Sequence, residues 1–352
     1  MSALAPRLSV CLPSHLPMAG ARQTIDNARE LSVRYPIEVI VSDNAADDDK
    51  AEELQALSTD RFHYLRSAAS NALGNWNHAL KHAGGKFACF LSDDDLLIAL
   101  PGFDSGGFDA PADAAGIRPT MALYTEQAGI YAQSSFDIPE TRAVDRVRSY
   151  FRKNGGVNTT LFSCFRRELT QDLIGDIEAY HPTRGGYSDW AWVLGLISSG
   201  PLVSNPHLLY IYNNRNWATS DDIARNTKRT FRDAGLPEDT AQILQPLTAL
   251  DAFGTICRAS SPISVEEKRE AGLFAVAAYF DGFAARLRDP GFTRDFTLER
   301  LDLAREMAAE AVEPRDKLAA SLLLAEAWIP GSHEAYTRYF GQTLARGALR
   351  GL

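Results

Sequence analysis

The chain has 352 residues, of which 45% are hydrophobic and 23% charged, which is ordinary for one large or two average-sized globular domains. Its formal net charge is −9, whereas nonspecific nucleic-acid binding requires a basic surface. We therefore expect no nucleic-acid partner. No stretch approaches the roughly 20 apolar residues that a membrane-spanning helix needs, so we expect no membrane span.

The cysteines and the N-terminal segment indicate in which cellular compartment the protein lies. Cys11, Cys89, Cys164 and Cys257 lie far apart, which suits reduced, buried thiols better than a disulfide framework or a zinc site. The first residues contain one arginine and a short apolar run interrupted by Pro13, a pattern typical of a first strand rather than of a signal peptide. We therefore expect a cytoplasmic protein.

The N-terminal part of the chain alternates between short apolar runs and segments of helical composition. The apolar runs predict strands at residues 8–12, 37–41, 62–65 and 87–91, and the segments between them predict helices at 19–34, 47–57 and 71–82. This order predicts an α/β fold, a doubly wound, mostly parallel sheet that is flanked by helices and joined by right-handed crossovers.

The remainder of the chain divides into a mixed part and a helical part. Residues 101–119 are rich in Gly, Pro and Asp and predict a loop. Further strands are expected within 120–132 and at 161–165 and 208–212, with helices at 143–153, 166–177 and 187–198. Strand signals vanish beyond about residue 221, which predicts an α/β domain at 1–220 and an all-helical C-terminal domain at 221–352. Its helices are expected from the capping box at Ser264 onward and at 298–311, 314–328 and 334–346.

An acidic turn, Asp93-Asp94-Asp95, follows the apolar run at 87–91. Adjacent carboxylates repel one another unless a cation or a donor-rich ligand satisfies them. In open α/β sheets, ligands bind just beyond the carboxyl ends of the strands. The turn therefore predicts a site for Mn²⁺ or Mg²⁺ and a polyphosphate, and the alternative is a solvated acidic loop.

Polar residues also follow the other predicted strands. Pro13-Ser14-His15 follows the first strand, Asp43 the second, and Arg66 and Asn71 the third. In a parallel sheet these groups lie along one edge. A carboxylate suits the hydrogen-bonding edge of a base or ribose, and an arginine suits a phosphate. The set predicts a nucleoside-diphosphate site.

Four segments, LSVCLPS, EVIVSDNAADD, NALGNWNHALKHAGGKFACFLSDDD and GYSDW, resemble the inverting family 2 glycosyltransferases of GT-A fold. The resemblance covers residues 8–217, and residues 71–95 are its most specific part. It implies a metal-dependent transfer of a sugar from a nucleoside-diphosphate donor, with a UDP-sugar favoured. The acceptor would be a hydroxyl of a saccharide or glycolipid.

The resemblance also implies roles for individual residues. Asp94 together with Asp93 would bind the metal, Asp95 would lie beside the donor sugar, and Asp189 would be the catalytic base. The resemblance would also give donor-binding roles to Pro13, His15, Asp43, Asp93 and Asp95. Ser14, Arg66 and Asn71 are further donor-binding candidates because of their positions after the predicted strands. A carboxylate near the transferred carbon can accept the proton of a sugar hydroxyl, although an Asp that opens a helix is also a common cap.

This chain departs from the family pattern at three places. Ser92 and Ser188 stand where many members have Asp and Glu, and the late His of the family is absent. Arg215 is the candidate substitute for the missing His and would be a further donor-binding residue. The departures motivate an alternative, a non-catalytic nucleotide-sugar-binding or scaffolding protein of the same fold. A nucleotidyltransferase is disfavoured because residues 13–17 contain no loop rich in Gly and Lys.

The family resemblance also suggests a cellular role and location. The role that the resemblance suggests is bacterial surface-polysaccharide synthesis, which would put the protein in the cytoplasm or at the inner face of the membrane. The sequence leaves open a peripheral membrane contact and a homo-oligomer.

Overall fold

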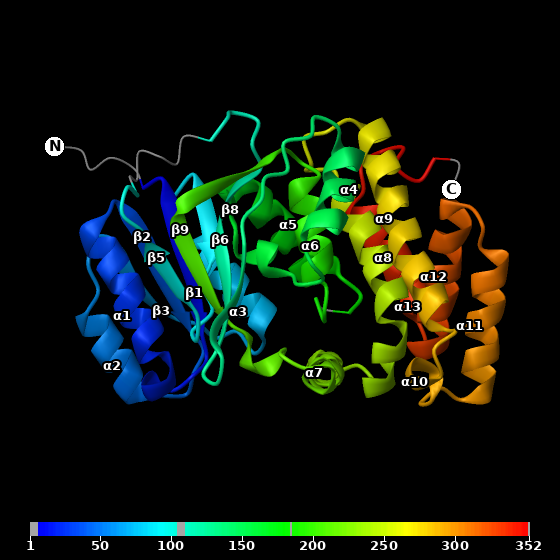
Figure 1. Ribbon diagram of the computed structural model, residues 1–352, viewed down its shortest axis with the longest axis horizontal. Coiled ribbons are helices and arrows are strands. Elements are labelled where there is room, and N and C mark those ends of the chain that lie inside the picture. Colours follow the sequence, from blue (N-terminus) through cyan, green and yellow to red (C-terminus); the bar gives the residue numbers. More distant parts are fainter. Residues whose placement is uncertain (1–5, 104–109, 184, 351–352) are drawn as a thin grey trace. The chain divides into compact units, whose positions relative to one another are not determined.

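The computed structural model describes residues 6–103, 110–183 and 185–350. The chain forms two compact units, coloured along the sequence in Figure 1. The first unit comprises Met1–Pro139, Arg152–Gly175 and Gly200–Ala218, and the second comprises Glu140–Phe151, Asp176–Ser199 and Thr219–Leu352. The chain thus enters the second unit for the last time close to residue 220, and two earlier stretches also pack there. The division into a catalytic domain at 1–220 and a helical domain at 221–352 stays a prediction.

A sheet forms the centre of the first unit. In the described part of the chain it has nine strands in the order β3-β2-β1-β4-β8-β6-β9-β5, and β7 pairs with β6. The strands are β1 (Leu8–Ser14), β2 (Ile37–Asp43), β3 (Phe62–Arg66), β4 (Phe87–Phe90), β5 (Leu96–Ala99), β6 (Gly116–Thr125), β7 (Gly129–Ser134), β8 (Cys164–Arg166) and β9 (Leu202–Asn213).

The sheet is parallel over β3-β2-β1-β4 and mixed beyond β4, where β8 runs antiparallel to both of its neighbours. Helices α1 (Met18–Arg34) and α2 (Asp48–Ala56) lie on one face of the sheet, and α3 (Ala72–Lys81) lies on the other (Figure 1). The expected α/β class is confirmed. The mixed part reflects later strands that pair with partners distant in sequence.

Two side-chain caps fix where the helices begin next to the sheet edge. Asp47 accepts a hydrogen bond from the backbone N–H of Lys50 at 2.9 Å, so α2 begins at Asp48. Asn71 accepts one from the backbone N–H of Gly74 at 2.8 Å, so α3 begins at Ala72. Each cap satisfies a backbone donor that the helix itself cannot pair.

Some predicted boundaries are wrong in an informative way. The strand expected at 161–165 is a 3₁₀-helix at Thr159–Phe162 followed by the short β8. Part of the loop expected at 101–119 is the start of β6, while residues 104–109 lie outside the described residues. The apolar residues after the acidic turn form β5, which pairs antiparallel with β9. Local sequence cannot reveal such distant partners.

The second unit is helical, as expected for the C-terminal part of the chain. Its helices are α4 (Ala143–Lys153), α6 (Asp189–Ile197), α7 (Ser220–Asp233), α8 (Leu244–Ile256), α9 (Val265–Arg286), α10 (Pro290–Thr293), α11 (Leu298–Glu310), α12 (Pro314–Trp328) and α13 (Ser332–Thr343). The helix α5 (Arg167–Tyr180) begins in the first unit and ends in the second, and the last two residues of α4 belong to the first unit. Helix α8 is buried from Pro246 to Ile256 and forms the centre of an aromatic-rich core with Phe280, Trp328 and Tyr336.

Two further observations bear on the sequence expectations. The four cysteines are free and buried. Over the described ranges, no helix combines the length and the hydrophobicity of a transmembrane segment.

Two adjacent glycines before β4 give a test of the packing. A Cβ on Gly85 would lie 2.7 Å from the backbone nitrogen of Ser9 in β1, whereas a Cβ on Gly84 would lie 3.4 Å from a flexible carboxylate oxygen of Glu38. We expect Gly85→Ala to lower the free energy of unfolding by about 1–3 kcal/mol through overpacking. Gly84→Ala should change it by less than about 0.5 kcal/mol, as most surface substitutions do. Urea unfolding of both variants measures the difference, and equal values would contradict the packing of β4 against β1.

Candidate functional site

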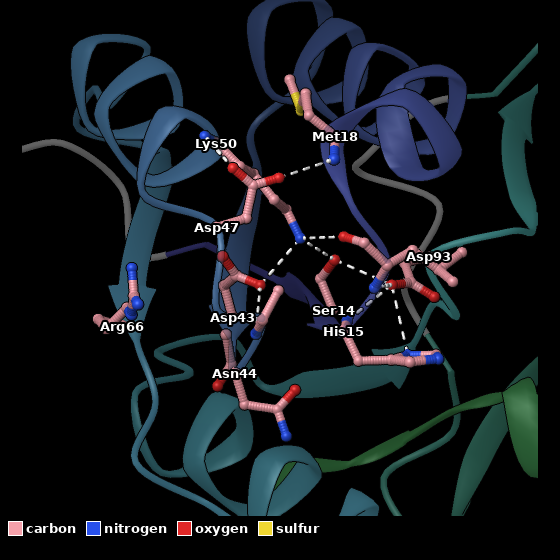
Figure 2. A network of polar contacts seen from close by, with 12 residues as sticks. Ser14, His15, Met18, Asp43, Asn44, Asp47, Lys50, Arg66 and Asp93 are labelled. Carbon is pink, nitrogen blue, oxygen red and sulfur yellow. Dashed lines mark hydrogen bonds and ion pairs between the residues drawn. The ribbon is translucent and has the colours of Figure 1, made fainter.

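A buried lysine joins the carboxyl ends of β1 and β2. The Nζ atom of Lys50 donates hydrogen bonds to Asp43 Oδ1 at 2.8 Å, Ser14 Oγ at 2.7 Å and the Leu16 carbonyl at 2.8 Å (Figure 2). The side chains of Lys50 and Asp43 are both 0% exposed. The three acceptors match the three donors of the ammonium group, so this buried charge is fully paired.

The same network reaches the acidic turn through Ser14. The Ser14 hydroxyl donates to Asp93 Oδ2 at 2.9 Å, and the backbone N–H groups of His15 and Leu16 donate to the same oxygen at 2.8 and 2.9 Å (Figure 2). Asp93 is buried, while the side chain of His15 is exposed. Asp93 therefore fixes the turn after β4 against the end of β1.

Asp94 differs from both of its neighbours because it is half-buried and faces a cation. Its Oδ2 atom lies 3.3 Å from the guanidinium of Arg215, in the 3₁₀-turn Asn214–Asn216 that follows β9. Burial raises the pKa of Asp94, the charge of Asp93 raises it further, and Arg215 opposes both effects. The predicted substitute for the missing histidine thus lies beside the predicted metal ligand.

Asp95 is buried and anchors the turn to β9. Its Oδ2 accepts a hydrogen bond from the Tyr210 hydroxyl at 2.7 Å, and its Oδ1 accepts one from the backbone N–H of Asn213 at 2.7 Å. Burial, followed by the charge of Asp94, raises the pKa of Asp95 to about 8. Three adjacent carboxyl groups therefore have three environments, and a cation near Asp94 would ease their repulsion.

The remaining predicted donor residues of the first unit lie at or near this edge. Ser14, Asp43 and Arg66 are register partners across β1, β2 and β3, as expected for strand ends of a parallel sheet. Arg66 is exposed and pairs with Asp48 at 3.2 Å. Pro13 is buried within β1, and Asn71 caps α3.

The predicted catalytic base lies in the second unit. Asp189 is the first residue of α6, and Ser188 is its N-cap residue. Tyr187 has a φ of 57°, in the left-handed region that non-glycine residues rarely adopt. Such a conformation persists only where its surroundings enforce it, and it often marks a functional site.

The donor set fits a metal ion that is shared with a diphosphate. Within the described residues, no group of three or more His, Cys, Asp and Glu side chains is arranged to hold a metal alone. Magnesium commonly binds through one or two carboxylates together with substrate phosphates. The half-buried Asp94 suits that kind of site, because protein donors already occupy oxygens of Asp93 and Asp95.

Sequence reasoning missed three side chains that organise the edge, Lys50, Asn75 and Tyr210. Asn75 donates to the carbonyl of Ser14 at 3.2 Å and to Asn44 Oδ1 at 3.3 Å, so it ties the ends of β1 and β2 together. A signal existed for Lys50, since it shares with Leu54 the i, i+4 spacing of a buried helix face. No comparable local signal pointed to Asn75 or Tyr210.

A protein-family match covers the strand ends described above. Residues 9–98, from β1 into β5, match the model of the family "Glycosyl transferase family 2". This stretch holds the Lys50 network and the acidic turn. The resemblance to family 2 glycosyltransferases inferred from the motifs is thus confirmed over residues 9–98.

The individual proteins that the chain resembles share little sequence with it or match only part of it. The chain is 32% identical over 98 residues to the GalNAc(5)-diNAcBac-PP-undecaprenol beta-1,3-glucosyltransferase of Campylobacter jejuni, covering 27% of this chain and 31% of that protein. It therefore spans less than a third of the curated relative it matches. Crystal structures of S. aureus TarS 1–349, alone and with UDP-GlcNAc, give TM-scores of 0.42 and 0.40 at 14% and 13% identity, covering 91% of each chain. Similarity this low says nothing about ligands.

The buried ion pair gives a stability test. Lys50→Met would leave the carboxylate of Asp43 buried without its cation, so we expect the free energy of unfolding to fall by about 3–5 kcal/mol. The double variant Asp43→Asn/Lys50→Met removes both charges and should recover much of that loss. Urea unfolding of the single and double variants measures the coupling. A loss below about 1 kcal/mol in Lys50→Met would contradict the pairing.

Proposed function

We propose that this protein is a metal-dependent, inverting glycosyltransferase. It transfers a sugar from a nucleoside-diphosphate donor, with a UDP-sugar favoured, to a hydroxyl of a saccharide or glycolipid acceptor. One observation carries the proposal: Asp94 pairs with Arg215 beside the Lys50 network, at the edge where a family 2 domain would bind its donor.

The nucleoside would bind at the ends of β1 to β3. Pro13, Ser14 and the exposed His15 would border it. The side chain of Asp43 is 0% exposed, so its contact with the base would require the Tyr64 hydroxyl to move away from Asp43 Oδ2. Arg66 supports a phosphate or ribose contact, because its guanidinium is exposed and offers several donors. Asn71 begins the helix that follows β3 and would contribute from its capping position.

The leaving diphosphate would lie at the acidic turn. Asp94, with Asp93, would hold Mn²⁺ or Mg²⁺, which when bound neutralises charge on the leaving group. Arg215 provides a second positive charge at the same place, and its planar guanidinium suits a phosphate. Asp95, which is bonded to β9, would border the donor sugar.

Asp189 would act as the general base of a single displacement. The acceptor oxygen forms a bond to the anomeric carbon while the bond from that carbon to the diphosphate breaks. The carboxylate of Asp189 takes the proton of the acceptor hydroxyl in the same step. Attack opposite to the leaving group inverts the anomeric configuration.

The name of the relative supports a proposal for the acceptor. The name of the Campylobacter protein includes a lipid-linked saccharide, GalNAc(5)-diNAcBac-PP-undecaprenol. We therefore include a lipid-linked saccharide among the acceptors. A cytoplasmic protein with peripheral contact at the inner face of the membrane, in bacterial surface-polysaccharide synthesis, would meet such an acceptor.

A second candidate is a nucleotide-sugar-binding or scaffolding protein without catalysis. The missing late His and Ser188, which stands where many family members have Glu, favour it. The two candidates differ in whether donor is consumed. A thermal-shift screen of nucleoside diphosphates with and without Mn²⁺ selects the donor for the tests below, since selective binding raises apparent stability.

Asp94→Asn tests the metal step. We expect Mn²⁺-dependent hydrolysis or transfer of the selected donor to fall by on the order of 10²-fold or more, because a charge at the leaving group is lost. Asp60→Asn, an exposed residue outside the site, is the matched control and should retain wild-type rates. Wild-type turnover would reject the non-catalytic candidate, and unchanged rates in Asp94→Asn would contradict the role of Asp94.

Asp189→Asn tests the base. We expect transfer to fall by about 10²–10⁴-fold, the usual contribution of general base catalysis, while the nucleotide Kd stays unchanged. The exposed Asp302→Asn on α11 is the control of equal chemistry. Calorimetry gives the Kd and a product assay gives kcat. Transfer within a few-fold of wild type would assign the base elsewhere.

A further inference from the structure

A buried histidine in the second unit lies next to the turn that begins α6. His181 directly follows α5, and its Nε2 atom lies 2.8 Å from Asp251 Oδ1 on α8, although the N–H is not aligned for a hydrogen bond. The hydroxyl of Tyr336 on α13 donates to the same carboxylate oxygen at 2.7 Å. The three side chains are 0–3% exposed. Two C-terminal helices thus hold the imidazole in place.

The other ring nitrogen faces the turn. The backbone N–H of Gly185 donates to His181 Nδ1 at 3.2 Å, and the Thr183 hydroxyl lies 3.2 Å from the same atom. Because Nδ1 accepts a backbone hydrogen bond, the proton of the neutral ring is on Nε2, toward Asp251.

Gly185 links His181 to the start of α6, because it also forms hydrogen bonds with Ser188. Its carbonyl accepts hydrogen bonds from both the hydroxyl of Ser188, at 3.0 Å, and the backbone N–H of Ser188, at 3.3 Å. Ser188 is the N-cap residue of α6, and Asp189 comes next. A continuous chain of contacts therefore runs from His181 through Gly185 and Ser188 to the proposed base.

The turn also holds a strained residue. Tyr187, at a φ of 57°, lies between Gly185 and Asp189, and its ring stacks on Phe231 with the centroids 6.2 Å apart. A left-handed tyrosine needs contacts on both sides to persist. Phe231 supplies the contact on the ring side, and the hydrogen bonds of Gly185 supply the contact on the backbone side.

We propose that His181 is a positioning residue for the base Asp189, acting through the Nδ1 contact with Gly185, while Asp251 and Tyr336 orient the ring. The inference rests on the proposed function of Asp189. In this proposal the C-terminal helices α8 and α13 contribute to the transfer reaction, because they fix the conformation of the turn that precedes Asp189.

Two variants of His181 separate this role from simple stabilisation. In His181→Asn the side-chain oxygen can replace Nδ1 as the acceptor for Gly185, but nothing reaches Asp251. In His181→Gln the amide nitrogen can replace Nε2 toward Asp251, but the acceptor for Gly185 is lost. Both variants remove the ring, so a purely structural histidine would make them alike.

We expect His181→Gln to lower kcat by on the order of 10²-fold with donor KM unchanged, as small displacements of catalytic groups do. His181→Asn should retain kcat within about tenfold of wild type. Amide hydrogen exchange over residues 185–190 should be faster in His181→Gln than in His181→Asn. Equal losses of kcat together with equal exchange in the two variants would overturn the inference.

The exchange measurement keeps the inference separate from the proposed function. If wild type transfers no sugar, the proposed function fails, yet unequal exchange in the two variants still supports the positioning of the turn. If neither His181 variant folds, Tyr336→Phe replaces them, since it keeps the ring and removes only the hydroxyl on Asp251. Faster exchange at 185–190 with unchanged exchange in α12 supports the inference, and no change at 185–190 overturns it.

Discussion

The site in the first unit depends on one buried ammonium group. A lysine closed off from water is tolerated only when acceptors surround it, and Lys50 has a carboxylate, a hydroxyl and a carbonyl. These acceptors come from the ends of β1 and β2 and from Leu16, two residues after β1. The charge therefore locks two strand ends and a helix together, and through Ser14 it also holds Asp93.

The acidic turn shows how neighbours in sequence acquire different tasks. Asp93 and Asp95 are buried and accept hydrogen bonds from protein donors, so they fix the turn to β1 and β9. The side chain of Asp94 is 24% exposed and lies opposite Arg215. Because the rigid pair positions the third carboxylate, a metal and a diphosphate would meet a preorganised ligand, which lowers the cost of binding.

The sequence predicted this edge well but not what holds it. The strand ends at Ser14, Asp43 and Arg66 could be foreseen, because parallel strands joined by helices place their carboxyl ends together. The pairing of Tyr210 with Asp95 could not, because it depends on β9 returning beside β5 from more than a hundred residues away. The contact between His181 and Asp251 could not be predicted either, because the two residues are far apart in the sequence.

The most direct test of the central claim is a crystal structure of the protein with UDP and Mn²⁺, with anomalous data collected at the manganese edge. We expect a manganese peak at coordination distance from both Asp94 and the diphosphate, with the uridine at the ends of β1 and β2. A manganese peak away from Asp94, or a nucleotide bound away from that edge, would contradict it.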